Sequence, residues 1–189
     1  AGLGRMRWRD LDHDGKITEL DQTWIYDPVP DFTYGFNIYL EYKNFDFTAF
    51  FQGVQGVDII SDLKRETDIW AGLNIGFLNK GHRLLNAWCV DNPSSNIPAV
   101  TLSDNNNEKR VSTYWVENGS YLKLRTIQLG YNLPQNIVSK LSMQRLRMYV
   151  SAQNLFTIKS SSFTGVDPEN PNYGYPIPLN ITFGLNVTF

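Results

Sequence analysis

The residues with the most evident chemistry lie near the start of the chain, where aspartates occur at alternate positions. Asp10, Asp12 and Asp14 precede Gly15, and Asp21 closes the segment. Calcium-binding loops of the EF-hand type use this spacing, with oxygen ligands at the first, third, fifth, seventh, ninth and twelfth positions and a glycine at the sixth for a sharp turn. In this chain the six ligand positions hold Asp10, Asp12, Asp14, the carbonyl of Lys16, Thr18 and Asp21.

The ion that this loop would hold follows from the hardness and reach of its ligands. Carboxylate and carbonyl oxygens suit hard cations, so the predicted cofactor is Ca²⁺. Asp21 is shorter than the glutamate usual at the twelfth position, which weakens bidentate contact and makes Mg²⁺ an alternative. A hydrated acidic turn, stabilised by its own side-chain hydrogen bonds to the backbone, is the competing interpretation.

No other group of residues predicts catalysis. The two histidines, His13 and His82, lack partner motifs, and the single cysteine, Cys89, excludes an internal disulfide. We therefore expect no enzymatic activity and no catalytic residues. The residues that would bind a substrate are unknown at this level. Packing of the central segment on itself is the favoured role, ahead of sugar stacking, for Trp70, Trp88 and Trp115.

Hydrophobic and polar residues alternate along several segments, which is the period of a β-strand with one apolar face. The clearest run starts at Phe32 and resumes after Lys43-Asn44, so residues 32–54 predict a hairpin. Further strands are expected at 121–131, 144–154 and 180–189. In the first of these the alternation changes phase between Leu124 and Ile127, which indicates a β-bulge.

The lengths of the strands and of their connections favour a membrane protein. Strands of roughly 10 residues suit a tilted crossing of a bilayer. The connections at 43–44 and 132–143 are short or moderate, whereas those at 55–120 and 157–179 are long. Outer-membrane barrels typically combine short periplasmic turns with long external loops. A soluble β-sandwich stays open as the alternative, because the same alternation could bury the apolar face.

Composition narrows the classes of function. The 189 residues carry 17 basic and 19 acidic side chains, a formal net charge of −2, which excludes a nucleic-acid binder that acts mainly through charge. No apolar run is long enough for a transmembrane helix. The first residues form no basic and apolar leader, so we expect either a processed chain or a piece of a longer one.

Several separate stretches resemble, in the same order, the SusC/RagA-type TonB-linked outer-membrane transporters. They include ENGSYLKL at 117–124, YVSAQNLF at 149–156 and GVDPE at 165–169. The others are residues 10–21, 30–36, 44–47, 50–53, 56–58, 88, 92–93, 129–134 and 182–189. Each fragment alone is weak, but the ordered set is specific. The chain resembles the C-terminal part of the β-barrel of such a transporter.

The resemblance implies a fold, a location and partners. The fold would be all-β, a plugged transmembrane barrel of 22 antiparallel strands to which this chain contributes about five. It would span the outer membrane of a Gram-negative bacterium in many passes, take energy from TonB through an absent N-terminal part, and pair with a SusD-like surface lipoprotein. The cargo would be glycans or peptides too large for porins. The barrel-assembly machinery would recognise Phe189 as its assembly signal.

The resemblance also divides the chain into loops and strands. The external loops would be 1–31, 55–120 and 157–179, and the strands would lie within 32–54, 121–154 and 180–189. Arg145 and Arg147 would face the lumen and pair with acidic residues of the plug. Two alternatives to active import are kept. One is a passive porin or structural barrel, and the other is a secreted, calcium-stabilised β-sandwich that binds carbohydrate.

Overall fold

Long strands dominate the computed structural model, which describes residues 2–68, 80–101, 103–171 and 174–189. No helix within these ranges is both long and apolar enough to cross a membrane. The chain divides into two compact units, which are described separately. In chain order the elements are η1 Glu19–Asp21, β1 Phe32–Tyr42, β2 Phe45–Gln55, β3 Asp58–Ile60, α1 Asp62–Asp68, η2 His82–Asn86, η3 Thr113–Trp115, β4 Val116–Asn118, β5 Tyr121–Asn132, α2 Gln135–Val138, η4 Ser139–Leu141, β6 Arg145–Lys159 and β7 Asn180–Thr188.

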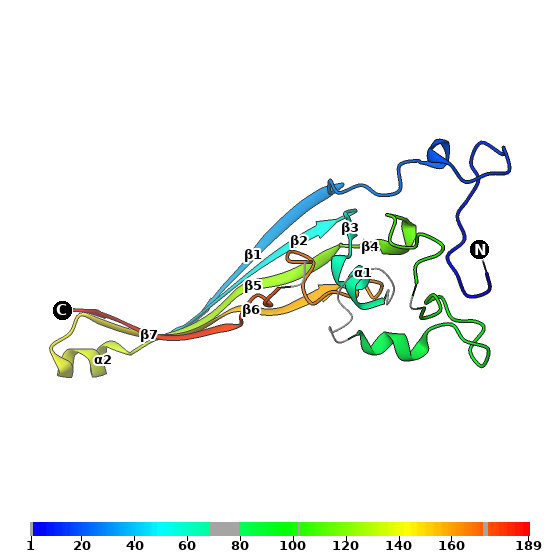
Figure 1. Ribbon diagram of the computed structural model, residues 1–189. Helices are drawn as coiled ribbons and strands as arrows, with labels where there is room; N and C mark the ends of the chain where they lie inside the picture. The colour runs from blue at the N-terminus through cyan, green and yellow to red at the C-terminus, as the bar shows by residue number, and fades with distance from the viewer. Residues whose placement is uncertain (1, 69–79, 102, 172–173) are drawn as a thin grey trace. The chain divides into compact units, whose positions relative to one another are not determined.

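One unit, which we call the sheet unit, is built on five antiparallel strands in the order β1-β2-β5-β6-β7 (Figure 1). Its residues are 29–57, 118–170 and 174–189. The predicted hairpin is β1 with β2, joined at Lys43-Asn44, where Lys43 has a positive φ of 54°. The prediction of an all-β antiparallel fold is confirmed.

Apolar residues share one face of this sheet from edge to edge. Leu40 lies opposite Phe47, and Phe47 lies opposite Leu129. Leu129 lies opposite Val150, and Val150 opposite Phe183. Because directly opposite residues point to the same side of a sheet, this row is continuous across all five strands. Leu40 is 60% exposed and Phe183 is 80% exposed, so the alternation builds an apolar surface more than it builds a core.

The predicted bulge in β5 is confirmed. The register with both neighbouring strands shifts between Leu124 and Thr126, which leaves Arg125 without a directly opposite residue. This extra residue returns Ile127 to the apolar face and explains the change of phase in the sequence. Across from it in β6, Asn154 has a φ of 56°. Since the alternation of β6 breaks at this point, the sequence prediction ended the strand at residue 154, whereas β6 continues to Lys159.

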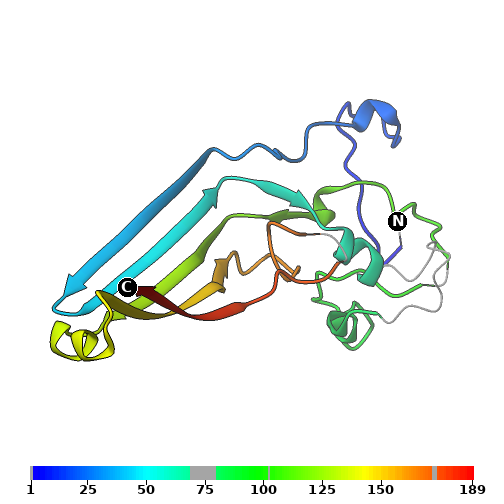
Figure 2. The same ribbon diagram turned by 90° about the vertical axis from the view of Figure 1, so that its left-hand side faces the viewer.

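The short connections and the C-terminus lie at the same end of the sheet. α2 and η4 connect β5 to β6 there, and the backbone N–H of Gln144 donates to the carbonyl of Thr188 at 2.7 Å (Figures 1 and 2). The β1–β2 turn is also at this end, because Phe45 pairs with Tyr131 near the end of β5. The chain leaves the sheet for its long segments at the opposite end.

The other unit, which we call the loop unit, contains residues 2–28, 58–68, 80–101, 103–117 and 171 among those described. It holds the short β3–β4 pair and helix α1. Trp115 is fully buried, its indole N–H donates to the carbonyl of Arg110 at 3.0 Å, and its ring meets Tyr114 edge to face. The described part of the segment expected as a loop at 55–120 therefore contains short regular elements and a buried tryptophan.

Candidate functional site

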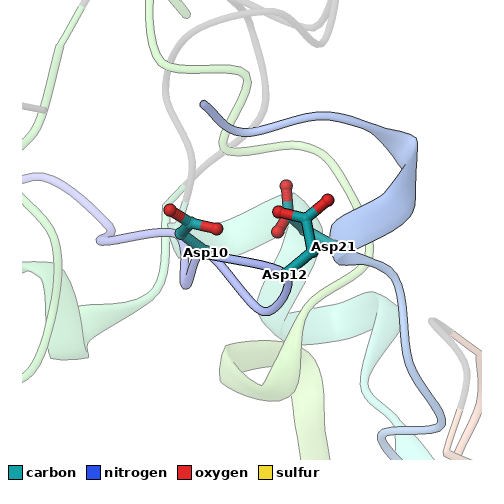
Figure 3. Close-up of side chains that lie close together, drawn as sticks. All are labelled: Asp10, Asp12 and Asp21. Atoms are coloured by element: carbon teal, nitrogen blue, oxygen red, sulfur yellow. The ribbon is translucent and has the colours of Figure 1, made fainter. Parts of the chain in front are cut away.

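Three of the predicted metal ligands come together in the loop unit. Each of Asp10, Asp12 and Asp21 offers a carboxylate oxygen that lies within 4.8 Å of the other two (Figure 3). Asp14 is not part of this group, and one of its carboxylate oxygens accepts the backbone N–H of Lys16 at 2.7 Å. The ligand role of the Lys16 carbonyl stays a prediction.

Hydrogen bonds from the backbone hold the first half of this aspartate loop, which we define as residues 10–21. The Asp10 carboxylate accepts the N–H groups of His13 at 2.7 Å and Gly15 at 2.9 Å. Asp12 accepts the N–H of Asp14 at 3.2 Å. Gly15 has a φ of 80°, a conformation that costs glycine little and other residues more. The glycine at the sixth position therefore has the turning role that the sequence predicted.

Asp21 closes the loop through a capping box at η1. Its carboxylate accepts the N–H of Thr18 and the N–H of Leu11, each at 2.7 Å. These two backbone hydrogen bonds, that from Thr18 first, hold the pKa of Asp21 below its ordinary value. The Thr18 hydroxyl accepts the N–H of Leu20 at 3.2 Å as the N-cap. Asp21 therefore stays charged while it shapes the loop.

The convergent carboxylates fit a hard divalent cation. Oxygen donors are the ligands that Ca²⁺ and Mg²⁺ prefer, and neighbouring carboxylates repel one another unless a cation or hydrogen bonds compensate them. Backbone N–H groups already occupy part of their lone-pair capacity. A carboxylate has about four lone-pair sites, so metal coordination and these hydrogen bonds are compatible.

The aspartate loop also forms one wall of a cleft of about 1370 Å³ within the loop unit. We call it the tryptophan cleft, because its lining includes Trp8, Trp24 and Trp88. Sequence reasoning missed this cleft. A signal was present in residues 5–9, where arginines alternate with Met6 and Trp8. The alternation lies in irregular backbone rather than in a strand, so it indicated no element.

The three tryptophans weighed from the sequence have different surroundings. Trp115 is fully buried, as expected of packing. Trp88 is half-buried in the cleft wall, and a Cβ on Gly4 would lie only 2.3 Å from its ring, so only glycine fits there. Trp70 lies outside the described residues.

A second cluster of charges lies on the polar face of the sheet unit. Lys123 of β5 is fully buried, and its Nζ contacts Asp167 at 2.7 Å and Glu169 at 2.6 Å. Arg125 and the Tyr121 hydroxyl also donate to Glu169. Burial raises the pKa of Glu169, but hydrogen bonds from Lys123 and Tyr121 outweigh it and hold that pKa below its ordinary value. The network fastens residues 160–170 onto the sheet.

Arg145 and Arg147 have partners within this chain. Arg147 donates to Asp46 of β2 at 2.9 Å through its Nε, across the place where Gly130 has no side chain. Their pairing with acidic residues of a plug stays a prediction. Arg145 donates to the side-chain oxygen of Asn132 at 3.1 Å. Both arginines therefore have partners inside the sheet. The sequence did not indicate Asp46 as the partner of Arg147, because the two residues lie 101 positions apart.

Phe189 follows β7 directly and is 77% exposed. The strand before it presents Ile181, Phe183, Leu185 and Val187 on the apolar face, all exposed. Its aromatic ring therefore ends an apolar stripe, and its role as an assembly signal stays a prediction.

Comparison with known proteins finds relatives that match nearly the whole chain. No family model matches it. TonB-dependent receptor P3 of Formosa agariphila is 37% identical over 95% of this chain and 18% of the relative. TonB-dependent receptor SusC of Bacteroides thetaiotaomicron is 27% identical over 95% of this chain and 17% of the relative. The solved RagAB peptide importer in its closed-closed state superposes with a TM-score of 0.75 at 27% identity, covering 95% of this chain and 20% of that one. The chain thus spans about a fifth of the length of the proteins that it matches.

Proposed function

Because the chain is homologous to TonB-dependent receptors of the SusC type over nearly its whole length, we propose that it forms part of an outer-membrane barrel that imports bulky nutrients with energy from TonB. Its relatives are receptors and transporters rather than enzymes. The chain would contribute five neighbouring strands of the wall and three of the segments that extend from one end of it.

The observation that carries this proposal is the pair of unlike faces on the sheet. One face exposes large apolar side chains such as Phe183 and Leu185, which are 80% and 67% exposed. Exposing apolar area to water costs roughly 25 cal/mol per Å², but lipid removes that cost. The other face carries charged and hydrogen-bonded groups such as Asp46 with Arg147, which suits a wet lumen.

The edges of the sheet support a larger barrel. β1 and β7 each pair with one strand only among the described residues, and they are 11 and 9 residues long. Long unpaired edges recruit further strands. We infer that neighbouring barrel strands from the rest of the protein complete both edges.

We further propose a SusD-like surface lipoprotein as partner and glycans or peptides as cargo. The proposal rests on the relatives: SusC is one of them, and the RagAB structure is named as a peptide importer. The long segments at one end of the sheet would face the partner, since the short turns at the other end suit the periplasm.

The aspartate loop would hold Ca²⁺, with Mg²⁺ as the alternative, between Asp10, Asp12 and Asp21. The convergence of these carboxylates is what supports the proposal. A bound cation would stiffen a segment in which η1 is the one regular element and side-chain hydrogen bonds to the backbone hold the rest. It would thereby fix the wall of the tryptophan cleft to which Asp21 contributes.

Energised uptake tests the proposed function. Cells would express the full-length protein with its partner, and uptake of fluorescent oligosaccharides and oligopeptides would be compared with and without TonB. We expect the protein in the outer-membrane fraction and uptake that disappears without TonB. Uptake that persists without TonB would instead indicate a passive porin, and recovery of the protein in the soluble fraction would exclude a barrel.

A further inference from the structure

The cationic side chains of the tryptophan cleft outnumber its anionic ones. Arg7, Arg9 and Arg110 line it and are exposed. Arg5 also lines it but is paired with Glu108 at 2.7 Å. No ion pair engages the first three arginines within the ranges that the structure describes. Asp21 is the one carboxylate among the described lining residues, and both of its oxygens accept backbone N–H groups. The cleft therefore has unneutralised positive charge.

Aromatic rings stand beside these guanidinium groups. Trp8 is fixed by its indole N–H, which donates to the carbonyl of Asn106 at 3.0 Å, and the Arg110 guanidinium lies 5.6 Å from its ring centroid. Trp24 is 96% exposed, so its faces are free to bind. The electron-rich faces of indole rings attract the slightly positive C–H groups on the flat side of a sugar ring.

The remaining polar groups suit a ligand rich in hydroxyls. Ser95, Asn96 and Thr113 line the cleft with groups that both donate and accept hydrogen bonds. The hydroxyl oxygen of Ser112, another lining residue, is buried and has no partner within the described part of the chain. A buried polar group without a partner is costly, and a ligand hydroxyl would satisfy it.

From these features we propose that the tryptophan cleft binds an anionic oligosaccharide, with its carboxylate or sulfate groups on Arg7, Arg9 and Arg110 and its sugar rings against Trp8 and Trp24. The cleft volume of about 1370 Å³ exceeds the roughly 300–1,000 Å³ of sites for drug-sized molecules, which suits several linked sugars. Arginine forms paired hydrogen bonds with planar carboxylates and also binds sulfate. The inference rests on the proposed import function and narrows its cargo class.

Binding measurements on the full-length protein in detergent, with its partner, test the inference. The probes are a galacturonate hexamer, its carboxyl-reduced neutral form, a sulfated galactan hexamer and a glutamate-rich peptide of equal charge. We expect an anionic hexamer to bind at least tenfold more tightly than the neutral one. The carboxylated and sulfated probes show which anion the arginines select. The advantage should shrink at high salt, because exposed charges are screened.

Two variants locate the binding in the cleft. Arg7→Gln with Arg9→Gln removes two exposed arginines, and we expect about tenfold weaker binding of the anionic hexamer. Lys109→Gln with Lys140→Gln removes the same charge from exposed positions outside the cleft lining and should leave binding unchanged. Trp24→Ala should weaken binding of the anionic hexamer severalfold and leave the salt dependence of that binding unchanged.

Three results would overturn the inference. They are equal affinity for the neutral hexamer, no effect of the arginine pair, or binding of the peptide that is as tight as that of the sugar and lost in the same variants. Each of these is distinct from failure of the import function. If cells import neutral sugars with TonB while the anionic probes do not bind, import stands and the cleft assignment falls. If the anionic hexamer binds in the cleft but no TonB-dependent uptake occurs, the cleft assignment stands and the import function falls.

Discussion

At the scale of single residues, the sequence indicated the aspartate loop well because its ligands are neighbours along the chain. Regular spacing near one glycine predicts a turn, and the structure brings Asp10, Asp12 and Asp21 together. The structure does not bring Asp14 into that group. Partners that are far apart in sequence were not predictable: nothing in the residues around Lys123 indicates that Asp167 and Glu169 lie against it.

The first prediction concerns the metal. Asp12→Ala should weaken Ca²⁺ binding about tenfold or more, since it removes one of three converging carboxylates. Limited proteolysis of the full-length protein should cut residues 10–21 faster after chelation of Ca²⁺, and in the variant at all Ca²⁺ concentrations. Glu19→Gln, a nearby exposed acid outside the group, is the matched control and should behave as wild type. If the rate of proteolysis within residues 10–21 of the wild-type protein is the same with and without chelator, the metal site is excluded.

A second prediction concerns Lys123. Lys123→Met leaves Asp167 without its cation and Glu169 with Arg125 alone, and breaking a buried pair in this way costs roughly 3–5 kcal/mol. We expect residues 160–170 to detach from the sheet and to exchange amide hydrogens faster. Lys159→Met removes a nearby lysine that donates to the backbone carbonyls of Gly165 and Val166 and lies over the Phe163 ring, but neutralises neither carboxylate, so it should have a smaller effect. Equal protection in all three proteins would show that the network does not hold this segment.

Acid should release the same segment. The folded pKa of Glu169 lies below its ordinary value of 4.5, so its ionised form contributes stability that is fully present above about pH 4.5. That contribution is lost as the pH falls through the lower folded pKa. Cleavage of residues 160–170 by pepsin should therefore increase as the pH is lowered below 4.5. In the Glu169→Gln variant, pepsin should cleave this segment readily at every acidic pH. A pH-independent rate in wild type would contradict this.

At the scale of elements, alternation predicted the strands and their faces, and it failed where the backbone departs from regular pleating. The bulge at Arg125 was predictable, because the alternation of apolar residues in β5 changes phase there. The last five residues of β6 were not predicted as strand, because the positive φ of Asn154 interrupts the alternation within the strand. The order within the loop unit was not predictable, since β3, β4 and η3 are three residues each and have no measurable period.

The two ends of the sheet give a topology prediction. An epitope inserted after Asn105, an exposed residue of the long central segment, should be labelled by antibody on intact cells. One inserted after Lys140, within η4 of the β5–β6 connection, should be labelled only after the outer membrane is opened. Labelling in the opposite sense would invert the orientation of every strand.

Phe189 gives a prediction for the last strand. Burial of a phenylalanine side chain is worth roughly 1.5–3 kcal/mol, which is small beside the stability of a barrel. Phe189→Ala should therefore lower the amount of protein in the outer membrane severalfold, while the inserted molecules keep near-normal heat resistance. Val187→Ala, one inward step along the same stripe, should cost less assembly. Unchanged membrane levels in the Phe189 variant would exclude an assembly role.

At the scale of the whole molecule, the proposed function depends on which solvent each face of the sheet meets. The same alternation would serve a soluble sandwich if the apolar face were covered, and the sequence left both open. In the structure each of the five strands exposes apolar side chains on that face, and the relatives are TonB-dependent receptors. The apolar face therefore meets lipid in this account, and the polar face meets water.

Spin labels on adjacent residues of β7 test this claim most directly. In the full-length protein, reconstituted into lipid and freed of other accessible cysteines, labels are placed at Phe183→Cys and Thr182→Cys, which point to opposite faces. Oxygen concentrates in lipid and a charged nickel complex stays in water, so collision rates with each report the surroundings. We predict that the label at position 183 meets oxygen and excludes nickel, and that the label at 182 shows the reverse. Nickel access at position 183 equal to that at 182 would contradict a lipid-facing sheet.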